Sequence, residues 1–314
     1  MKVSAYATVY NNSNTIEKSL KTLYSTMNDH FDEWELVVVD NFSTDGTWDI
    51  LCSWKKEHRN IKLLRFKCWR GKGRNIALAN TSGKYVFYVD LDCIFEKYFG
   101  LLISKEIEIC GTNDVIFPYA VTSKKNAVEI GWKNLNWGED LDFFFRAARS
   151  FHLKTCLIYP FSMNEKMNRP RGMRYARGIK FIKRMLVDQV SAMYGCRLGP
   201  LKYARFVSRA RMPLPLYLLC IGTYPLVFPF TLSIKLISEP PGETRISKIY
   251  PEELGFDEMF FFYSLELEDV GIKKILSEVT EVIKHYNGEI KIKRIGSRVF
   301  CYKDERILKK MIPF

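Results

Sequence analysis

The chain has 314 residues, of which 47% are hydrophobic and 26% are charged, so it can bury a substantial core and hold a catalytic domain with an appended part. Its eight cysteines are scattered without a Cys-x-x-Cys pair, and with four histidines they exclude a zinc-finger spacing and a disulfide framework. The formal net charge of +13 implies an anionic partner, and the absence of a signal-peptide pattern at the first residues favours an intracellular setting.

The first 160 residues alternate between strand and helix patterns. Strands are predicted at 3–10, 34–39, 61–66, 84–89, 114–121 and 155–159. Helices are predicted at 14–27, after the turn at 44–46, and at 74–79, 95–109 and 139–150. A capping box over Asn14–Glu17 is expected to open the first helix. This alternation predicts an α/β domain over residues 1–165, with a doubly wound and mostly parallel sheet.

Residues 166–211 are predicted to form basic amphipathic helices. Between Glu165 and Arg211 the sequence has thirteen Lys or Arg residues and two acidic ones, whereas the remainder is nearly balanced. Such a concentration of charge favours nucleic acid, phosphate groups or an acidic membrane surface as the partner. Nucleic acid is the weakest of these explanations because no base-reading motif is present.

Residues 212–237 contain an apolar segment of the membrane type. The 23 residues from Met212 to Ile234 carry no charge, which is long enough to cross a bilayer. Four prolines in this run favour a kinked, re-entrant or interfacial hairpin as an alternative to a straight span. A buried helical hairpin of a soluble protein is the third possibility.

Residues 239–314 are predicted to form a small α+β unit. It begins after a proline-rich and glycine-rich linker. Its strands are expected near 259–267, 289–295 and 298–302, with a helix at 271–286 between the first two.

Two aspartates stand just after the buried strand at 84–89. Asp90 and Asp92 leave the strand together and can point at one ion. In a parallel sheet ligands bind outside the carboxyl ends of the strands, and Asp40 stands at another such end. Mg²⁺ and Mn²⁺ take oxygen ligands and are commonly shared with diphosphate oxygens, so the pair predicts a divalent metal site. In isolation the pair would equally fit an ordinary polar loop.

Four sequence blocks, in order, resemble the family 2 glycosyltransferases with the GT-A fold. The first has the strand and Tyr-Asn turn, and the second has the V-V-D-[DN]-x-S-x-D-G-T pattern. The third has R-N followed by G-x-Y, an apolar run and D-x-D, and the fourth has G-E-D-x-D and a later arginine. These blocks are Ala7–Asn11, Val37–Thr47, Gly71–Asn75 with Gly83–Asp92, and Gly138–Arg146.

The resemblance implies a role for each matching position. The residues expected to hold the nucleotide sugar are Thr8, Tyr10, Asn11, Asp40, Asn41, Arg74 and Asp90. Arg74 would face the diphosphate, since a guanidinium fork suits phosphate oxygens. Many members carry Asp where this chain has Asn41, and because an amide both donates and accepts, the base of the nucleotide stays open. Asp92, with Asp90, would hold Mg²⁺ or Mn²⁺.

The resemblance also implies that Asp140 is the general base of an inverting reaction, with Glu139 assisting the acceptor. Asp140 would take the proton of an acceptor hydroxyl that attacks the sugar opposite the leaving nucleotide. Acidic residues also favour the first turn of a helix, and this structural explanation is compatible with catalysis because a helix N-terminus keeps a carboxylate ionised.

These features favour a metal-dependent glycosyltransferase at the cytoplasmic face of a membrane. It would use a nucleotide-diphosphate sugar and a glycan or lipid-linked acceptor. One alternative is a polyprenyl-phosphate sugar synthase, whose anionic nucleophile needs no base, and Glu139-Asp140 argues against it. Another is a non-catalytic nucleotide-sugar-binding membrane protein, which the intact carboxylates disfavour.

Overall fold

The computed structural model describes residues 1–95, 98–135 and 139–156 continuously, together with short pieces of the remainder. Those pieces are 165–166, 222, 246–249, 251–254, 261–263, 289, 291–295, 298–302 and 305. The predicted basic helices of 166–211, the apolar segment of 212–237 and the helix at 271–286 lie almost entirely outside these ranges. Within the described ranges no helix combines the length and apolarity that crossing a membrane would require.

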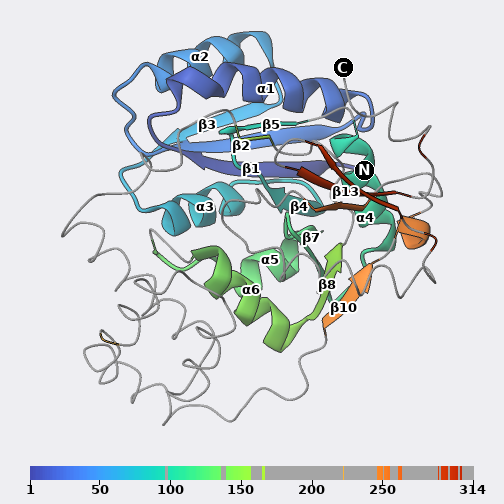
Figure 1. Cartoon of the computed structure of the whole chain (residues 1–314). Helices are drawn as coiled ribbons and strands as arrows, with labels where there is room; N and C mark the ends of the chain where they lie inside the picture. Colours follow the sequence, from blue (N-terminus) through green and yellow to red (C-terminus); the bar gives the residue numbers. More distant parts are fainter. Residues whose placement is uncertain are drawn as a thin grey trace.

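The central sheet has five strands in the order β3-β2-β1-β4-β7 (Figure 1). The first four are parallel and confirm the predicted alternation, whereas the short β7 is antiparallel to β4. Their bounds are β1 (Val3–Val9), β2 (Trp34–Asp40), β3 (Ile61–Arg65), β4 (Tyr85–Tyr88) and β7 (Thr122–Ser123).

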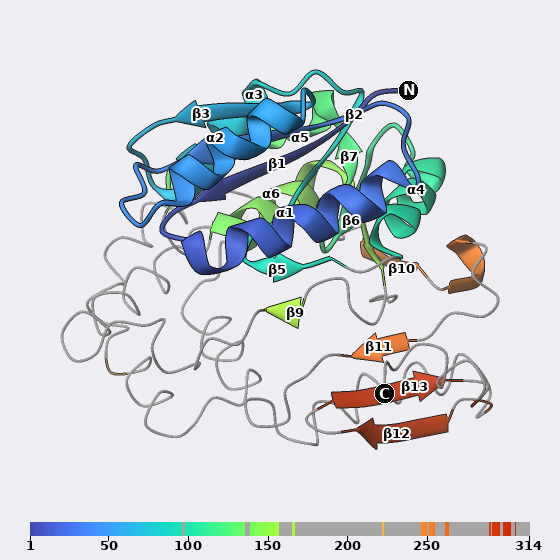
Figure 2. The same ribbon diagram turned by 90° about the horizontal axis from the view of Figure 1, so that it is seen from above.

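Helices cover both faces of this sheet. Figure 1 shows α1 and α2 above it and α3, α5 and α6 below it, and Figure 2 shows α1 and α2 lying along the strands. Their bounds are α1 (Ser13–Asn28), α2 (Thr47–Glu57), α3 (Arg70–Ala79), α4 (Phe99–Ile109), α5 (Lys124–Ile130) and α6 (Glu139–Ser150). The prediction missed α5 and began α3 one turn late.

The two faces of the sheet bury separate hydrophobic clusters. In β2, Leu36 and Val38 pack in the cluster beneath α1, whereas Val37 and Val39 pack in the cluster beside α3 and α6. Successive side chains of a strand point to opposite faces, so an unbroken apolar run is the pattern of a strand covered on both sides. This explains why the sequence predicted β2 well.

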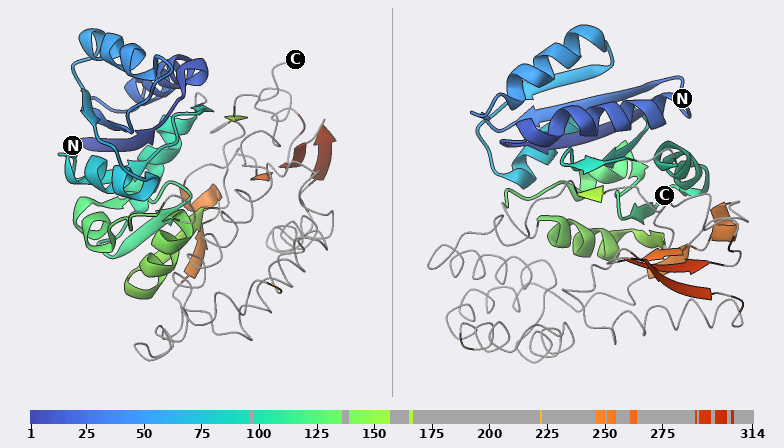
Figure 3. Two further views of the ribbon diagram at one scale, coloured as in Figure 1. Left: turned by 90° about the vertical axis from the view of Figure 1, so that its left-hand side faces the viewer. Right: turned by 45° about the horizontal axis from the view of Figure 1, so that its top comes forward.

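A second sheet of three parallel strands has the order β10-β8-β6 and lies beside α6 (Figure 3). Its strands are β6 (Asp114–Phe117), β8 (His152–Cys156) and β10 (Ile246–Ile249). The single strand predicted at 114–121 is wrong: the chain turns at Pro118–Ala120, where Ala120 has a φ of 51°, and continues as β7. The strand predicted at 155–159 begins three residues earlier.

The part of the chain beyond residue 239 contributes to two places. The strand β10 pairs with β8 in the second sheet. Farther on, β11 (Phe261–Tyr263), β13 (Arg298–Tyr302) and β12 (Lys291–Ile295) form an antiparallel sheet, which confirms the predicted strands. A two-stranded ribbon joins β5 (Cys93–Ile94) to β9 (Glu165–Lys166).

The first helix begins differently from the prediction. Asn14 lies inside α1, and Asn12 is the N-cap without a side-chain cap hydrogen bond, so the predicted capping box is wrong. The carboxylate of Asp45 instead accepts hydrogen bonds from the backbone N–H of Ser13 at 2.9 Å and of Thr47 at 3.0 Å. One side chain therefore caps the first turns of both α1 and α2.

We predict that Asp45→Ala lowers the free energy of unfolding by roughly 1 kcal/mol, as the loss of a helix cap does. Burial acts to raise the pKa of Asp45, but hydrogen bonds from Thr47 and Ser13 outweigh it and lower the pKa from 3.8 to about 2. The unfolded chain therefore binds this proton first, and the stabilisation present above pH 4 is lost as the pH falls towards 2.

Urea denaturation of both proteins between pH 2 and 7 would measure the effect. The exposed Asp49, in the first turn of α2, offers a control: Asp49→Ala makes the same change of charge and should cost less. Equal effects of the two variants at every pH would contradict the capping role.

Candidate active site

The carboxyl ends of β1, β2 and β4 meet at one edge of the central sheet (Figure 1). Val9 at the end of β1 lies in register with Asp40 at the end of β2. Tyr6 of β1 lies in register with Tyr88 at the end of β4, and Asp90 follows two residues later. The structure thus brings the predicted nucleotide and metal residues to one edge.

The turn after β1 carries Tyr10 and Asn11 in different situations. Asn11 has a φ of 52°, a left-handed conformation that asparagine tolerates. Its side-chain oxygen accepts a hydrogen bond from the N–H of Thr44, and its own N–H donates to the Ser43 hydroxyl, both at 3.0 Å. Asn11 therefore fastens the turn to the loop after β2. Tyr10 is 57% exposed, so its ring is accessible to a ligand.

Asp40 ends β2 with a fully buried carboxylate. Its Oδ2 accepts hydrogen bonds from the N–H of Ser43 at 3.0 Å and from Nε of Arg65 at 3.1 Å. Within the described residues, its Oδ1 is buried and has no hydrogen-bond partner. A buried oxygen with spare accepting capacity suits an N–H donor such as a nucleobase edge. The neighbouring Asn41 accepts a hydrogen bond from the N–H of Cys68 at 2.8 Å, which anchors the loop after β3.

Three further exposed aromatic side chains follow β2 and β3, and the sequence analysis did not single them out. Phe42, Phe66 and Trp69 are about half exposed, although side chains of this size are usually buried. The Arg65 guanidinium lies 5.0 Å from the centre of the Phe42 ring, and it is the same side chain that pairs with Asp40. Aromatic faces beside a few oriented polar groups are typical of small-molecule sites.

Thr8 lies where α3 approaches β1 most closely. Its hydroxyl donates to the carbonyl oxygen of Val39 at 3.2 Å. A Cβ placed on Gly73 would overlap that hydroxyl oxygen, so glycine permits this approach. The close contact brings the next residue, Arg74, to the end of β4.

Arg74 is the most enclosed cation of the site, with 3% of its surface exposed. Its Nη2 lies 2.9 Å from Oδ1 of Asp90, and its Nη1 lies 3.2 Å from Oε1 of Glu139. Burial acts to lower the pKa of Arg74, but Asp90 and Glu139 raise it above its usual range, so the side chain stays charged. The expected role of facing a diphosphate is untested, and in this structure the guanidinium joins two carboxylates.

Asp90 and Asp92 flank the buried Leu91, and the Asp90 side chain is 41% exposed. Oδ1 of Asp92 accepts a hydrogen bond from the Cys93 thiol at 3.4 Å. The described residues contain no group of three or more His, Cys, Asp or Glu side chains that could hold a metal ion. Two carboxylates fit a hard cation that completes its coordination with phosphate oxygens and water, rather than one held by protein alone.

Glu139 and Asp140 begin α6 but face different surroundings. Glu139 is buried between Arg74 and Arg70, whose Nη1 lies 3.4 Å from it, whereas Asp140 is exposed. Burial raises the pKa of Glu139 above its usual value, and the two arginines offset only part of that shift. Glu139 is therefore placed as a structural partner of Arg74, and the neighbouring Asp140 is the carboxylate that solvent and a ligand can reach.

The later residues of the fourth block have a structural role. The Asp142 carboxylate accepts a hydrogen bond from Nε of Arg146 at 2.8 Å and lies 3.0 Å from Nζ of Lys133. Arg146 also donates to the carbonyl oxygens of Ile130 and Gly131. These bonds hold α6 against the end of α5. Gly138, which opens the block, lies outside the described residues.

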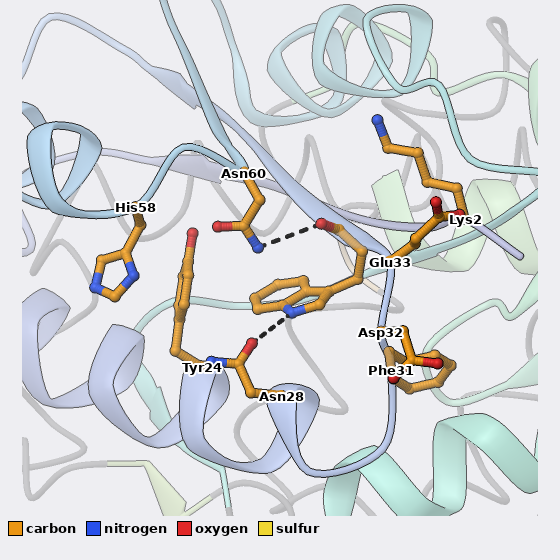
Figure 4. A pocket seen from close by; sticks show the side chains of 9 residues that line it. Lys2, Tyr24, Asn28, Phe31, Asp32, Glu33, His58 and Asn60 are labelled. Atoms are coloured by element: carbon orange, nitrogen blue, oxygen red, sulfur yellow. Dashed lines mark hydrogen bonds between the residues drawn. The ribbon is translucent and has the colours of Figure 1, made fainter.

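A cavity of about 420 Å³ lies at the opposite edge of the sheet, where the amino ends of β1 to β3 meet (Figure 4). Tyr24, Trp34, His58 and Asn60 are among its lining residues. The indole N–H of Trp34 donates to the side-chain oxygen of Asn28 at 2.8 Å. None of the predicted site residues lines this cavity.

Comparison with known proteins gives a family match and partial relatives. The sequence model of Glycosyl transferase family 2 matches residues 4–167, just over half of the chain. The UDP-Glc:alpha-D-GlcNAc-diphosphoundecaprenol beta-1,3-glucosyltransferase WfaP of Escherichia coli is 31% identical over 119 residues, which are 38% of this chain and 45% of that protein. A poly(ribitol-phosphate) beta-glucosyltransferase of Bacillus spizizenii is 32% identical over 95 residues, 29% of this chain and 15% of that protein. The chain thus spans less than half the length of these relatives.

Among solved structures, the crystal structure of S. aureus TarS 1–349 in complex with UDP-GlcNAc aligns with a TM-score of 0.46 and 19% identity. The alignment covers 73% of this chain and 82% of that one.

Proposed function

Because the chain belongs to glycosyl transferase family 2, we propose that it transfers a sugar from a nucleotide-diphosphate sugar to an acceptor hydroxyl, with inversion at the sugar carbon. The observation that carries this proposal is the arrangement around Arg74, which contacts both Asp90 of the D-x-D pair and Glu139 at the start of α6. This contact brings the candidate metal ligands and the candidate base, Asp140, to one edge of the sheet.

The donor nucleotide would bind at the ends of β1 and β2. The spare oxygen of Asp40 supports a hydrogen bond to the base, and the exposed ring of Tyr10 supports stacking. Thr8 and Asn41 lie beside them, although each already makes a hydrogen bond within the protein. Asn11 would act by shaping the turn rather than by direct contact.

Asp92 and Asp90 would hold Mg²⁺ or Mn²⁺ together with the diphosphate. The cation, when bound, would neutralise the charge that grows on the departing diphosphate. The fit rests on two carboxylates at a strand end, beside the position where a diphosphate would lie.

Asp140 would be the general base. It is exposed in the first turn of α6, where a helix N-terminus favours negative charge. The buried Glu139 behind it orients the first turn through Arg74 and Arg70. In the alternative function, a polyprenyl-phosphate sugar synthase, the phosphate nucleophile is already an anion and Asp140 would have no proton to take.

We also propose that the acceptor is a glycan or lipid-linked molecule bearing phosphate, met at the cytoplasmic face of a membrane. The names of both relatives describe phosphate-bearing acceptors, a diphosphoundecaprenol-linked sugar and poly(ribitol-phosphate). In this chain the basic stretch begins at Lys166, which pairs in β9 with Cys93, the residue after Asp92. Positive charge thus begins beside the candidate metal pair.

The direct experiment offers the purified full chain a panel of nucleotide sugars with Mn²⁺ and a membrane extract, followed by mass spectrometry of the products. Transfer from one donor would identify the sugar and the base. Donor hydrolysis without transfer would leave the acceptor open. If no donor is either hydrolysed or used for transfer, the result would favour the non-catalytic, nucleotide-sugar-binding alternative.

We predict that Asp92→Ala abolishes transfer and weakens donor binding in the presence of Mn²⁺, because the remaining carboxylate, Asp90, is already paired with Arg74. Calorimetry of the donor with and without Mn²⁺ measures the effect. Asp49→Ala, a change of the same kind at an exposed position of α2, is the control. Unchanged affinity and rate in Asp92→Ala would contradict the metal assignment.

We predict that Asp140→Asn lowers kcat by roughly 100-fold or more while donor affinity is retained, because the amide keeps the shape but cannot accept the proton. Single-turnover kinetics with saturating donor would measure the loss. Activity near that of the unaltered protein would instead favour the polyprenyl-phosphate sugar synthase.

We predict that the full chain pellets with membranes and resists extraction by high salt or carbonate. The apolar run of 212–237 would be buried in lipid and the basic stretch would meet anionic headgroups, at about 1 kcal/mol for each basic residue near the surface. A truncated chain of residues 1–211 should bind anionic vesicles and leave them in high salt. Recovery of the full chain as a detergent-free soluble monomer would contradict this prediction.

A further inference from the structure

The guanidinium of Arg74 packs against two aromatic rings that also contact each other. Its central carbon is 4.7 Å from the ring centre of Tyr88 and 4.7 Å from that of Trp132. A cation over an aromatic face is attracted by the negative charge of the ring, and most strongly where water is excluded. Because Arg74 is almost fully buried, the two rings limit where the guanidinium can lie, and in that position it pairs with Asp90 and Glu139.

Trp132 is itself fixed by contacts from the elements around it. Its indole N–H donates to the hydroxyl oxygen of Tyr6 in β1 at 3.0 Å, and its backbone N–H donates to the side-chain oxygen of Asn75 in α3 at 3.1 Å. The ring of Tyr88 meets its ring edge to face at 5.2 Å. Trp132 therefore has one position in the fold, although it lies in a loop between α5 and α6.

The Trp132 ring also contacts helix α6. Phe143 stacks on it with 4.3 Å between the ring centres and 19° between the planes. Phe143 stands four residues after Glu139, so the two side chains share one face of α6. Trp132 thus contacts α6 directly through Phe143 and indirectly through the ion pair of Arg74 with Glu139.

We propose that Trp132 is a positioning residue that sets the distance between the D-x-D pair and the base-bearing start of α6. Its ring contacts the Arg74 guanidinium, which pairs with Asp90, and it stacks on Phe143 of α6, where Asp140 follows Glu139 on the same helical turn. The expected effect on the rate rests on the proposed function. The contacts of Trp132 are features of the fold and do not depend on that function. Its ring and hydrogen-bond partners in the described part of the chain, Arg74, Asn75, Tyr6, Tyr88 and Phe143, are not residues expected to hold the nucleotide base.

The chain offers a matched control in Trp34. Both tryptophans are 5% exposed, and each donates its indole N–H to a side-chain oxygen. Each also meets a tyrosine ring edge to face. Trp34 lines the cavity at the opposite edge of the sheet, and the bonds to Asn28 and Asn60 are drawn in Figure 4. Replacing either removes a similar ring from the core, but only Trp132 contacts Arg74.

The test compares Trp132→Leu with Trp34→Leu in the full chain. We expect Trp132→Leu to lower kcat by about 10-fold or more with the KM for donor within about 3-fold of its original value, since α6 and Asp140 are displaced while Thr8, Asp40 and Asn41 at the ends of β1 and β2 are not. Trp34→Leu should lower thermal stability by a similar amount with kcat retained. Trp132→Phe keeps an aromatic face for Arg74 and should recover kcat to within about 3-fold.

A second readout does not depend on catalysis. Hydrogen exchange followed by mass spectrometry should show faster exchange of the amides of 139–147 in Trp132→Leu, unchanged in Trp34→Leu and restored in Trp132→Phe. If Trp132→Leu does not fold, Phe143→Leu removes only the ring stacked on Trp132 and should shift exchange and kcat in the same direction.

The outcomes separate this inference from the proposed function. Equal kcat and equal exchange for the two tryptophan variants would overturn the positioning role. A rise of the donor KM in Trp132→Leu that matches the fall in kcat would overturn it as well, since it would place Arg74 or Trp132 in direct contact with the donor. If the unaltered chain transfers no sugar, the proposed function fails. The hydrogen-exchange pattern alone then supports or rejects the positioning role of Trp132.

Discussion

The candidate site depends on how one buried positive charge is accommodated. A guanidinium removed from water is tolerated only where anions and polarisable groups replace its hydration. Arg74 finds two carboxylates and two aromatic faces. Those partners come from the end of β4 and, about forty residues later in the sequence, from the loop before α6 and the start of α6. Satisfying one charge therefore fixes the relative positions of three segments that carry the proposed chemistry.

The burial of Arg74 gives two adjacent carboxylates, those of Glu139 and Asp140, different roles. Glu139 turns inward, where burial raises its pKa and the arginines partly offset the cost of its charge. Asp140 turns outward on the next position of the helix and keeps access to solvent. A base must be ionised and reachable, whereas a structural anion must be enclosed and paired, and one side chain does not meet both conditions. Glu139 and Asp140 together meet the two conditions, one with each side chain.

The sequence predicted the first four parallel strands well because each is short, apolar and bounded by turn residues, so its pattern is local. The sequence-based prediction was wrong where residues distant in the sequence determine the local structure. Asp45, not a capping box at Asn14, caps α1, and the strand expected at 114–121 turns after Pro118. The pairing of β10 with β8 joins residues about ninety apart, which no local pattern contains. The sequence predicted which residues lie at the site and their expected roles. The burial of Asp40 and Arg74 depends on the side chains around them in the fold, and Trp132 belongs to none of the sequence blocks.

The position of Arg74 has a consequence for the proposed metal. A divalent cation beside Asp90 would lie close to a guanidinium that stays charged, and like charges in an enclosed site repel strongly. Asp90 also pairs with that guanidinium, so part of its negative charge is offset where the cation would bind. The diphosphate of a donor would supply the negative charge that the protein lacks at this point. Metal and donor should therefore bind better together than apart, and by linkage each should raise the affinity of the other by the same factor. If the coordination of the metal is complete only when the nucleotide is bound, the cation stays on the diphosphate of the donor. There it can neutralise the charge of the leaving group.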